Sequence, residues 1–99
     1  MIGCLLIHGF TGSPFEVEPL AQSLKKRTDW KIVVPTLPGH GDELRLKGIK
    51  HNEWLDHAEN ELKALLKECD TVFVVGFSMG GLIASYLASN YRVDKLVLL

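Results

Sequence analysis

Short runs of consecutive apolar residues alternate along the chain with longer segments of helical periodicity. The apolar runs predict four strands, at residues 2–8, 31–34, 71–76 and 94–99. Apolar side chains that recur every three or four positions predict three helices, at residues 13–29, 51–68 and 79–90. Continuous apolar strands separated by helices are typical of a parallel sheet that is covered on both faces. The pattern therefore predicts an α/β fold with three layers, a mostly parallel sheet between two layers of helices.

Capping and turn residues mark the boundaries of these elements. Ser13 can cap the first predicted helix, Pro14 fits its first position, and Glu16 completes a capping box. Residues 35–41 are rich in glycine and proline, which predicts a loop, and residues 42–50 have no clear periodicity. We therefore expect the second strand to be followed by a long irregular connection.

Length and composition narrow the class of protein. The 99 residues are enough for one domain, so we assign residues 1–99 to a single domain. A net charge of −1 gives no electrostatic basis for binding nucleic acid, and no apolar segment approaches the length of a membrane-spanning helix. The two cysteines, Cys4 and Cys69, are too few for a disulfide scaffold, and no Cys/His spacing indicates a metal site. We expect a reduced, cytoplasmic protein that binds neither nucleic acid nor a metal.

The sequence Gly76-Phe77-Ser78-Met79-Gly80 lies where a predicted strand meets a predicted helix. A G-x-S-x-G pentapeptide by itself is often an ordinary turn, but this strand-to-helix context favours a nucleophile elbow. The serine of such an elbow has a strained backbone and an exposed hydroxyl. The glycines on either side leave room where a Cβ atom would clash with the neighbouring strand and helix. Ser78 is therefore the candidate nucleophile.

Acyl transfer by a serine also needs a base, an acid that orients the base, and donors for the oxyanion. The backbone N–H of Met79, at the start of a helix, is one candidate donor. The loop that begins at His8 and Gly9 is a candidate source of the second donor. Because sites in parallel sheets form at the carboxyl ends of the strands, we expect this loop and Ser78 to lie at the same end.

Three motifs together resemble the α/β-hydrolase superfamily: Leu6-Ile7-His8-Gly9-Phe10, Pro38-Gly39-His40-Gly41 and Gly76-Phe77-Ser78-Met79-Gly80-Gly81. Within this superfamily the chain most resembles bacterial carboxylesterases and monoacylglycerol-lipase-like serine hydrolases, over essentially its whole length. The resemblance implies that Ser78 is the nucleophile and that the backbone N–H groups of Phe10 and Met79 form the oxyanion hole. It also implies hydrolysis of a small-molecule carboxylic ester through an acyl-enzyme, without a cofactor.

The chain departs from the superfamily on the carboxyl-terminal side of the nucleophile. The superfamily places the triad acid and then the histidine after the serine. Here Asp94 is the one carboxylate after Ser78, and no histidine comes after it. Asp94 precedes the fourth strand, at the wrong end of the sheet for catalysis. We therefore expect the acid, the histidine and any cap to lie beyond Leu99, and these 99 residues to be an inactive, partial hydrolase domain. If that part is produced alone, its apolar strand at 94–99 is expected to drive self-association.

All four histidines precede Ser78, and each has a structural interpretation. His8 is expected to hydrogen-bond its own loop rather than to transfer a proton. His40 is expected to support the loop near the mouth of the site rather than to contact substrate. His51 and His57 lie on a predicted helix outside the sheet, where we expect solvent exposure or capping.

Two alternatives to ester hydrolysis stay open. A non-catalytic binding or interaction module with this fold would account for the absence of a histidine after Ser78. An acyltransferase or thioesterase would use the same elbow. Epoxide-hydrolase and dehalogenase relatives are disfavoured, because they carry an aspartate where Ser78 stands.

Overall fold

A computed structural model describes residues 1–9, 17–37 and 51–99 of the chain. The elements come in the order β1 (Ile2–Ile7), α1 (Glu18–Arg27), β2 (Lys31–Val33), α2 (His51–Glu68), β3 (Thr71–Gly76), α3 (Met79–Asn90) and β4 (Lys95–Leu98). The predicted alternation of strands and helices is thus confirmed.

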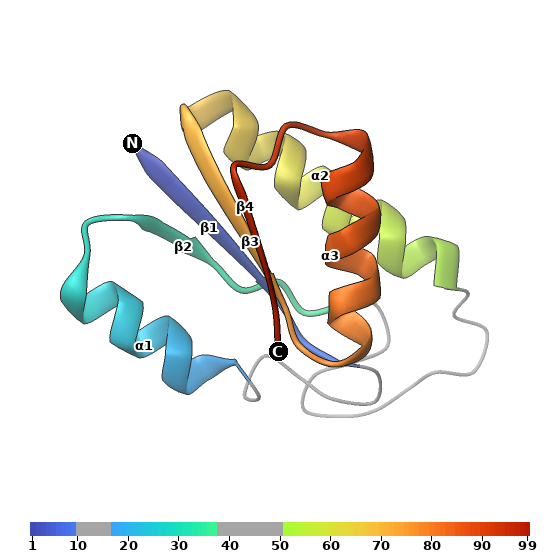
Figure 1. Cartoon of the computed structure of the whole chain (residues 1–99), viewed down its shortest axis with the longest axis horizontal. Helices are drawn as coiled ribbons and strands as arrows, with labels where there is room; N and C mark the ends of the chain where they lie inside the picture. Colours follow the sequence, from blue (N-terminus) through green and yellow to red (C-terminus); the bar gives the residue numbers. More distant parts are fainter. Residues whose placement is uncertain (10–16, 38–50) are drawn as a thin grey trace.

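The four strands form one parallel sheet in the order β2-β1-β3-β4. Strands β1 and β3 occupy the centre and pair over six positions, from Ile2 opposite Thr71 to Ile7 opposite Gly76. Helix α1 lies on one face of the sheet, and α2 and α3 lie on the other (Figure 1). The predicted α/β fold with a parallel sheet between two helical layers is confirmed.

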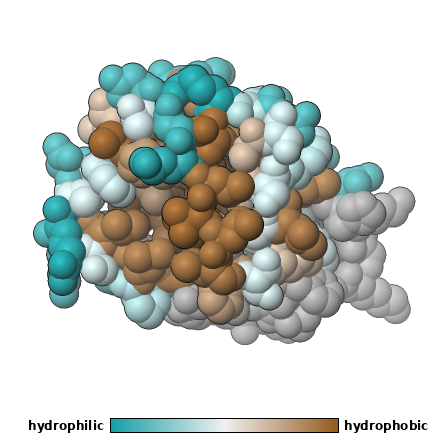
Figure 2. Space-filling model, viewed as in Figure 1, coloured by the Kyte–Doolittle hydropathy of each residue, from teal (hydrophilic) through white to brown (hydrophobic). Residues whose placement is uncertain are grey.

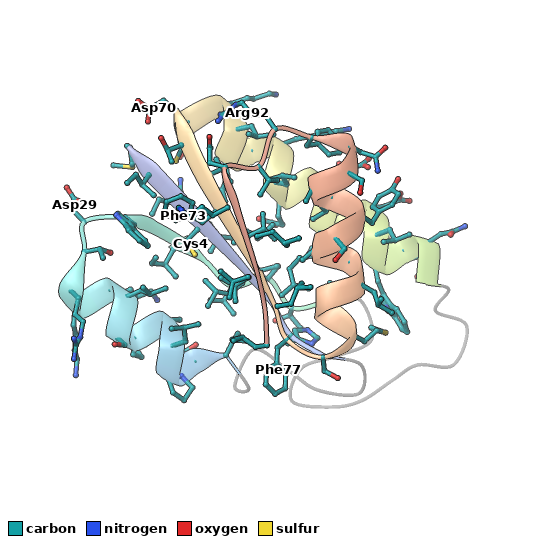
Figure 3. The ribbon with its side chains drawn as sticks, in the orientation of Figure 1. Cys4, Asp29, Asp70, Phe73, Phe77 and Arg92 are labelled. Carbon is teal, nitrogen blue, oxygen red and sulfur yellow. The ribbon has the colours of Figure 1, made fainter. Side chains whose placement is uncertain are left out.

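The central strand β1 contributes to two separate cores. Leu5 and Ile7 are fully buried and pack on the side of α2 and α3. Cys4 and Leu6 are also buried but belong to the cluster on the α1 side, where Figure 3 shows Cys4 near Phe73. Because both faces of the strand are covered, its sequence shows no alternation between apolar and polar residues.

The boundaries of α2, β3 and α3 agree with those expected from the sequence, those of β1, β2 and β4 differ by one residue at one or both ends, and α1 differs more. Helix α1 begins at Glu18, after a turn at Val17, and has Pro19 in its first turn. Proline fits there because the first N–H groups of a helix have no intrahelical acceptor. The predicted capping box from Ser13 to Glu16 and the irregular segment 42–50 lie outside the described residues. Strand β2 ends at Val33, one residue earlier than expected.

In the sheet that the described residues form, strand β4 lies at one edge and has exposed apolar side chains. The exposed fractions are 39% for Leu96, 42% for Val97, 57% for Leu98 and 59% for Leu99. Figure 2 shows the apolar patch to which they contribute, at the centre of the face that β4 crosses. Among the described strands, none pairs with the outer edge of β4. Such an edge offers unpaired backbone groups and apolar surface to a second chain.

We expect the 99-residue chain, produced on its own, to self-associate through β4. Light scattering coupled to size-exclusion chromatography should give a mass above that of one chain. Replacing Leu98 by lysine should shift the mass towards the monomer, because a charge on an edge strand opposes strand addition. Replacing Leu82, an exposed leucine on α3, by lysine is the control and should leave the mass unchanged. A stable monomer at micromolar concentration would show the expectation to be wrong.

Candidate active site

The carboxyl ends of β1 and β3 lie side by side and bring two sequence motifs together. Ile7 and Gly76 are register partners, and the N–H of Phe77 donates to the carbonyl oxygen of Ile7 at 2.9 Å. The segment His8-Gly9 therefore runs next to the turn that contains Ser78. This juxtaposition results from the parallel pairing and matches the expectation that both motifs share one end of the sheet.

Ser78 has a strained backbone at the junction between β3 and α3. Its φ is 55° and its ψ is −121°, and it is the only non-glycine residue with positive φ among those that the structure describes. Such a conformation costs on the order of 1–3 kcal/mol and persists only where the surrounding structure holds it. Ser78 occupies the N-cap position of α3 but makes no side-chain capping hydrogen bond. Its hydroxyl is therefore not used by the helix, and the residue is exposed to solvent.

Two glycines allow this turn because a side chain at either position would collide with backbone. A Cβ atom on Gly76 would lie 2.4 Å from the carbonyl oxygen of Gly80 and 2.6 Å from the Cα of Gly81. A Cβ atom on Gly80 would lie 2.3 Å from the carbonyl oxygen of Ile7. The close approach of α3 to β1 and β3 thus depends on the absence of side chains at both positions.

The first turn of α3 has one backbone N–H group, that of Met79, which is suited to the site. The N–H of Gly80 donates to the carbonyl oxygen of Phe77 at 2.9 Å, and that of Gly81 donates to the carbonyl oxygen of Ser78 at 2.8 Å. The N–H of Met79 is at the first helical position, where no intrahelical acceptor exists. The N-terminal end of a helix also carries partial positive charge. Both properties suit the Met79 N–H to an oxyanion beside Ser78.

His8 is completely buried, and backbone groups occupy both of its ring nitrogens. Its Nδ1 lies 2.8 Å from the carbonyl oxygen of Gly9, and the N–H of Leu37 donates to its Nε2 at 3.0 Å. A carbonyl oxygen only accepts and an N–H only donates, so the proton sits on Nδ1 and the ring is neutral. His8 therefore links the end of β1 to the segment after β2 by hydrogen bonds, in agreement with the structural role expected for it.

Replacing His8 by alanine is expected to lower the free energy of unfolding by roughly 2–5 kcal/mol, since it leaves a cavity and a buried Leu37 N–H without its acceptor. Urea denaturation measures this loss. The control is His57→Ala, a half-buried position on α2 that should change stability by about 1 kcal/mol or less. If His8→Ala abolished activity at unchanged stability, a chemical rather than a structural role would be indicated.

Asp94 lies at the opposite end of the sheet from Ser78. Its Oδ2 accepts hydrogen bonds from the N–H of Val72 and from the Arg92 guanidinium, each at 2.7 Å. Its own N–H donates to the carbonyl oxygen of Val72 at 2.8 Å. Asp94 thus ties the starts of β3 and β4 together, which agrees with its exclusion as a triad acid.

Some residues singled out in the sequence lie outside the described part of the chain. Phe10, the second expected oxyanion donor, is one of them, and the motif at residues 38–41, which includes His40, is another. His51 begins α2, and His57 is half-buried on the same helix. The described part of the site therefore consists of the Ser78 turn, the start of α3 and the His8-Gly9 segment.

Neither cysteine is suited to be a nucleophile in this site. Cys4 lies in the core on the α1 side, where burial raises the pKa of its thiol to about 11. A thiol with this pKa stays protonated near neutral pH and is a poor nucleophile. Cys69 is buried in the core on the opposite face of the sheet, so the two thiols cannot form a disulfide with each other. Ser78 is thus the better candidate on chemical grounds.

Two further properties hold for the described ranges 1–9, 17–37 and 51–99. They contain no group of three or more histidine, cysteine, aspartate or glutamate residues arranged to bind a metal ion. They also contain no helix that is long and apolar enough to cross a membrane.

The parallel sheet, the two helical layers and the strained serine between β3 and α3 define a class of protein. The model of the alpha/beta hydrolase family matches residues 4–99, and the chain belongs to this family. The family resemblance inferred from the three sequence motifs is thus confirmed.

Individual relatives match the chain over almost all of its length. A thermostable monoacylglycerol lipase of Bacillus sp. (strain H-257) is 36% identical over 91 residues, which are 91% of this chain and 36% of the lipase. A structure of the metagenome-derived lipolytic enzymes LipS and LipT superposes with a TM-score of 0.90 at 29% identity, over 98% of this chain and 40% of that one. An esterase from Exiguobacterium antarcticum shares the fold, with a TM-score of 0.74 at 24% identity, over 99% and 37% of the two chains. The chain therefore spans well under half the length of these relatives.

Proposed function

We propose that this chain carries the nucleophile and part of the oxyanion hole of a serine hydrolase that cleaves carboxylic esters. The observation that carries the proposal is the backbone of Ser78, with φ 55° and ψ −121° and no capping bond from its hydroxyl, between β3 and α3. Residues with a strained backbone of this kind cluster at active sites. The lipase and the lipolytic enzymes that the chain resembles support ester hydrolysis as the reaction.

The proposed reaction proceeds through an acyl-enzyme. The Oγ of Ser78 attacks the ester carbonyl carbon, a general base takes the hydroxyl proton, and the alcohol leaves with a proton from the same group. Water then attacks the acyl-enzyme, and the acid product and Ser78 are released. The N–H of Met79 stabilises the oxyanion in both steps, with the N–H of Phe10 as the second donor.

The base and its orienting acid are proposed to come from residues outside these 99. Both ring nitrogens of His8 form hydrogen bonds with backbone groups. The Asp94 carboxylate accepts hydrogen bonds from Val72 and Arg92 at the far end of the sheet. The whole enzyme, which we term the parent enzyme, is therefore the protein in which activity is expected. The 99 residues alone are expected to be inactive or nearly so.

A fluorophosphonate probe tests the proposal. The Oγ of Ser78 should attack phosphorus with loss of fluoride, and mass spectrometry of the parent enzyme should find the adduct on the peptide that contains Ser78. Ser85→Ala is a matched control, because Ser85 lies on α3 with its hydroxyl donating to the carbonyl oxygen of Gly81 at 2.8 Å. Labelling should survive that change. A parent enzyme that takes up no probe at Ser78 would favour the non-catalytic binding module.

A labelled enzyme that hydrolyses no simple ester would point to the acyltransferase or thioesterase alternative. These activities use the same acyl-enzyme but differ in the acceptor or in the leaving group. Offering a thioester, or an alcohol acceptor together with an ester, separates them. Ester hydrolysis is the preferred assignment because the named relatives include a lipase and lipolytic enzymes.

A further inference from the structure

Two consecutive residues of the Ser78 turn are hydrogen-bonded to different neighbours of β3 in the sheet. The N–H of Phe77 donates to the carbonyl oxygen of Ile7 at the end of β1, at 2.9 Å. The N–H of Ser78 donates to the carbonyl oxygen of Leu99, directly after β4, at 3.0 Å. Figure 1 shows the end of β4 at the same end of the sheet as the start of α3. Ile7 is fully buried and Leu99 is exposed, so the β4 side of the turn is the less protected one.

Both peptide groups that flank the Cα atom of Ser78 take part in hydrogen bonds. Its N–H donates to Leu99, and its carbonyl oxygen accepts the N–H of Gly81 at 2.8 Å. The φ and ψ of a residue describe how the two flanking peptide groups are turned relative to each other. The two bonds therefore hold these groups in the orientation that gives Ser78 its φ of 55° and ψ of −121°.

The side chain of Leu98 lies next to both of these bonds. A Cβ atom placed on Gly81 would lie 3.4 Å from the Cδ2 of Leu98, which is within van der Waals contact. Leu98 thus packs against the first turn of α3, at the residue whose N–H bonds to Ser78. It also directly precedes Leu99, the acceptor of the Ser78 N–H. One side chain therefore contacts the donor of one bond and adjoins the acceptor of the other.

We propose that Leu98 is a positioning residue for the nucleophile. Its packing against Gly81 keeps the end of β4 docked on α3, and the docked end supplies the acceptor for the Ser78 N–H. Without this packing the Ser78 backbone relaxes, because a strained conformation persists only where its surroundings hold it. The Oγ of Ser78 then leaves the position of attack. The inference rests on the proposed function and adds to it a residue that acts through Ser78 rather than on the substrate.

Replacing Leu98 by alanine in the parent enzyme should slow the reaction at Ser78 without weakening substrate binding. Misplacement of a reacting group by about 1 Å costs on the order of 100-fold in rate. Since the turn keeps its bond to β1, we expect a smaller fall, roughly tenfold, in kcat for p-nitrophenyl acetate and in the rate of fluorophosphonate labelling. KM should stay within about twofold, because the lost interaction does not involve the substrate. Rates are expressed per titrated active site, so a smaller folded fraction does not contribute.

Leu96→Ala is the matched control on the same strand. Leu96 lies two residues before Leu98, so both side chains point to the same face of the sheet, and both are exposed. Its register partner is Val74, whereas that of Leu98 is Gly76, so Leu96 lies further from the turn. Leu96→Ala should lower stability to urea but leave the rate per active site unchanged. An equal fall in both variants would show a general effect of weakening β4 and would overturn the proposal.

Two further variants complete the series. Leu98→Met keeps a long apolar side chain against Gly81 and should retain the wild-type rates within about twofold. Leu98→Val shortens the side chain but favours a strand, so it should reproduce the fall even if the alanine variant does not fold. A valine variant with wild-type rates, or a methionine variant as slow as the valine variant, would contradict the proposed packing.

Amide hydrogen exchange gives a readout that does not depend on turnover. In NMR spectra of the parent enzyme, the Ser78 N–H should exchange roughly tenfold faster in Leu98→Ala than in the wild type. The Phe77 N–H, which is bonded to β1, should keep its rate. Unchanged exchange at Ser78, or unchanged labelling per active site, would overturn the inference while leaving ester hydrolysis intact. A wild-type enzyme without any labelling at Ser78 would overturn the proposed function, and the inference with it.

Discussion

Replacing Ser78 by alanine is expected to reduce ester turnover by the parent enzyme roughly 10⁴- to 10⁶-fold, as loss of the nucleophile does in other serine hydrolases. The expected loss is this large because the change removes the covalent step and leaves only substrate binding and oxyanion stabilisation. Steady-state hydrolysis of p-nitrophenyl acetate, with active-site titration of the wild type, measures it. The alanine variant should also lose fluorophosphonate labelling.

The variant should keep its fold, because the Ser78 hydroxyl makes no capping bond to α3. Alanine does have to adopt a φ of 55°, so stability is expected to change by about 1 kcal/mol. Ser85→Ala removes a hydroxyl from the same helix and should retain wild-type turnover. Substantial turnover by a folded Ser78→Ala enzyme would contradict the assignment of the nucleophile.

The second large effect is expected at Gly80, where alanine should displace α3 from the sheet. Its Cβ would lie 2.3 Å from the carbonyl oxygen of Ile7 and 2.6 Å from that of His8. Backbone atoms of a central strand cannot give way as the end of a flexible side chain can, so the helix has to move. We expect a loss of about 3 kcal/mol or more in the free energy of unfolding. Since the Ser78 turn moves with the helix, turnover should fall at least about 100-fold.

Gly81→Ala is the matched comparison, one position further along the helix. There a Cβ would meet the Cδ2 of Leu98 at 3.4 Å and the carbonyl oxygen of Gly76 at 3.7 Å, which are ordinary contacts. Alanine also favours a helix over glycine by about 1 kcal/mol, so this variant should be neutral or slightly more stable. Urea denaturation and probe labelling of the two variants test the difference. Equal effects at both positions would show that steric fit at Gly80 is not what holds the turn.

Local steric rules made the Ser78 turn predictable from the sequence. A serine between two glycines, after an apolar run and before a helical segment, has few ways to connect a buried strand to a helix. The parallel sheet was predictable for a similar reason, because strands such as β1 and β3 have no polar face to expose. In both cases the deciding information lies within a few consecutive residues.

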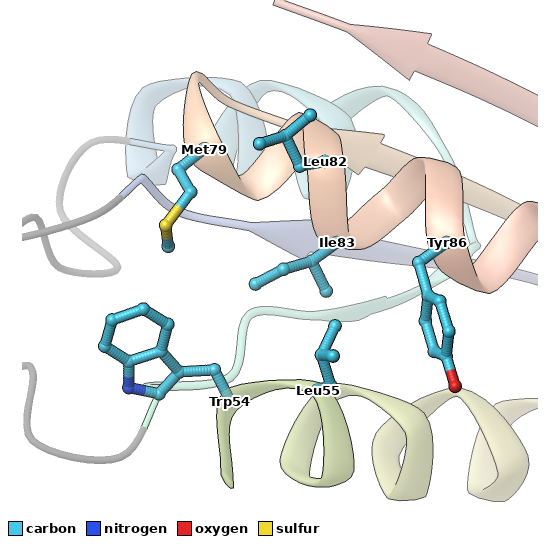
Figure 4. Close-up of a pocket in the computed structure, with 6 residues that line it drawn as sticks. All are labelled: Trp54, Leu55, Met79, Leu82, Ile83 and Tyr86. Carbon is cyan, nitrogen blue, oxygen red and sulfur yellow. The ribbon is translucent and has the colours of Figure 1, made fainter. Parts of the chain in front are cut away.

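Other features depend on contacts between distant segments. The hydrogen bond from Leu37 to His8 joins residues that are 29 positions apart, and no local pattern specifies it. Likewise, one face of α3 carries Met79, Leu82, Ile83 and Tyr86, but the helix is apolar on most of its other sides as well. Its sequence therefore does not show which face stays open. Trp54 and Leu55 on α2 lie across from that face and line an apolar pocket together with it (Figure 4).

Backbone hydrogen bonds also connect the turn at Ser78 to the edge of the sheet. The Ser78 N–H donates to the carbonyl oxygen of Leu99 at 3.0 Å, and the Leu99 N–H donates to that of Gly76 at 2.9 Å. One backbone bond thus connects the strained residue itself, and a second connects Gly76 at the end of β3, to Leu99 directly after β4, the strand with the most exposed side chains. Edge strands open more readily than central ones, so local unfolding of β4 would release the turn without unfolding the core. We therefore expect the docking of β4 to help hold Ser78 in its strained conformation, and a surface that covers this strand to stabilise the turn.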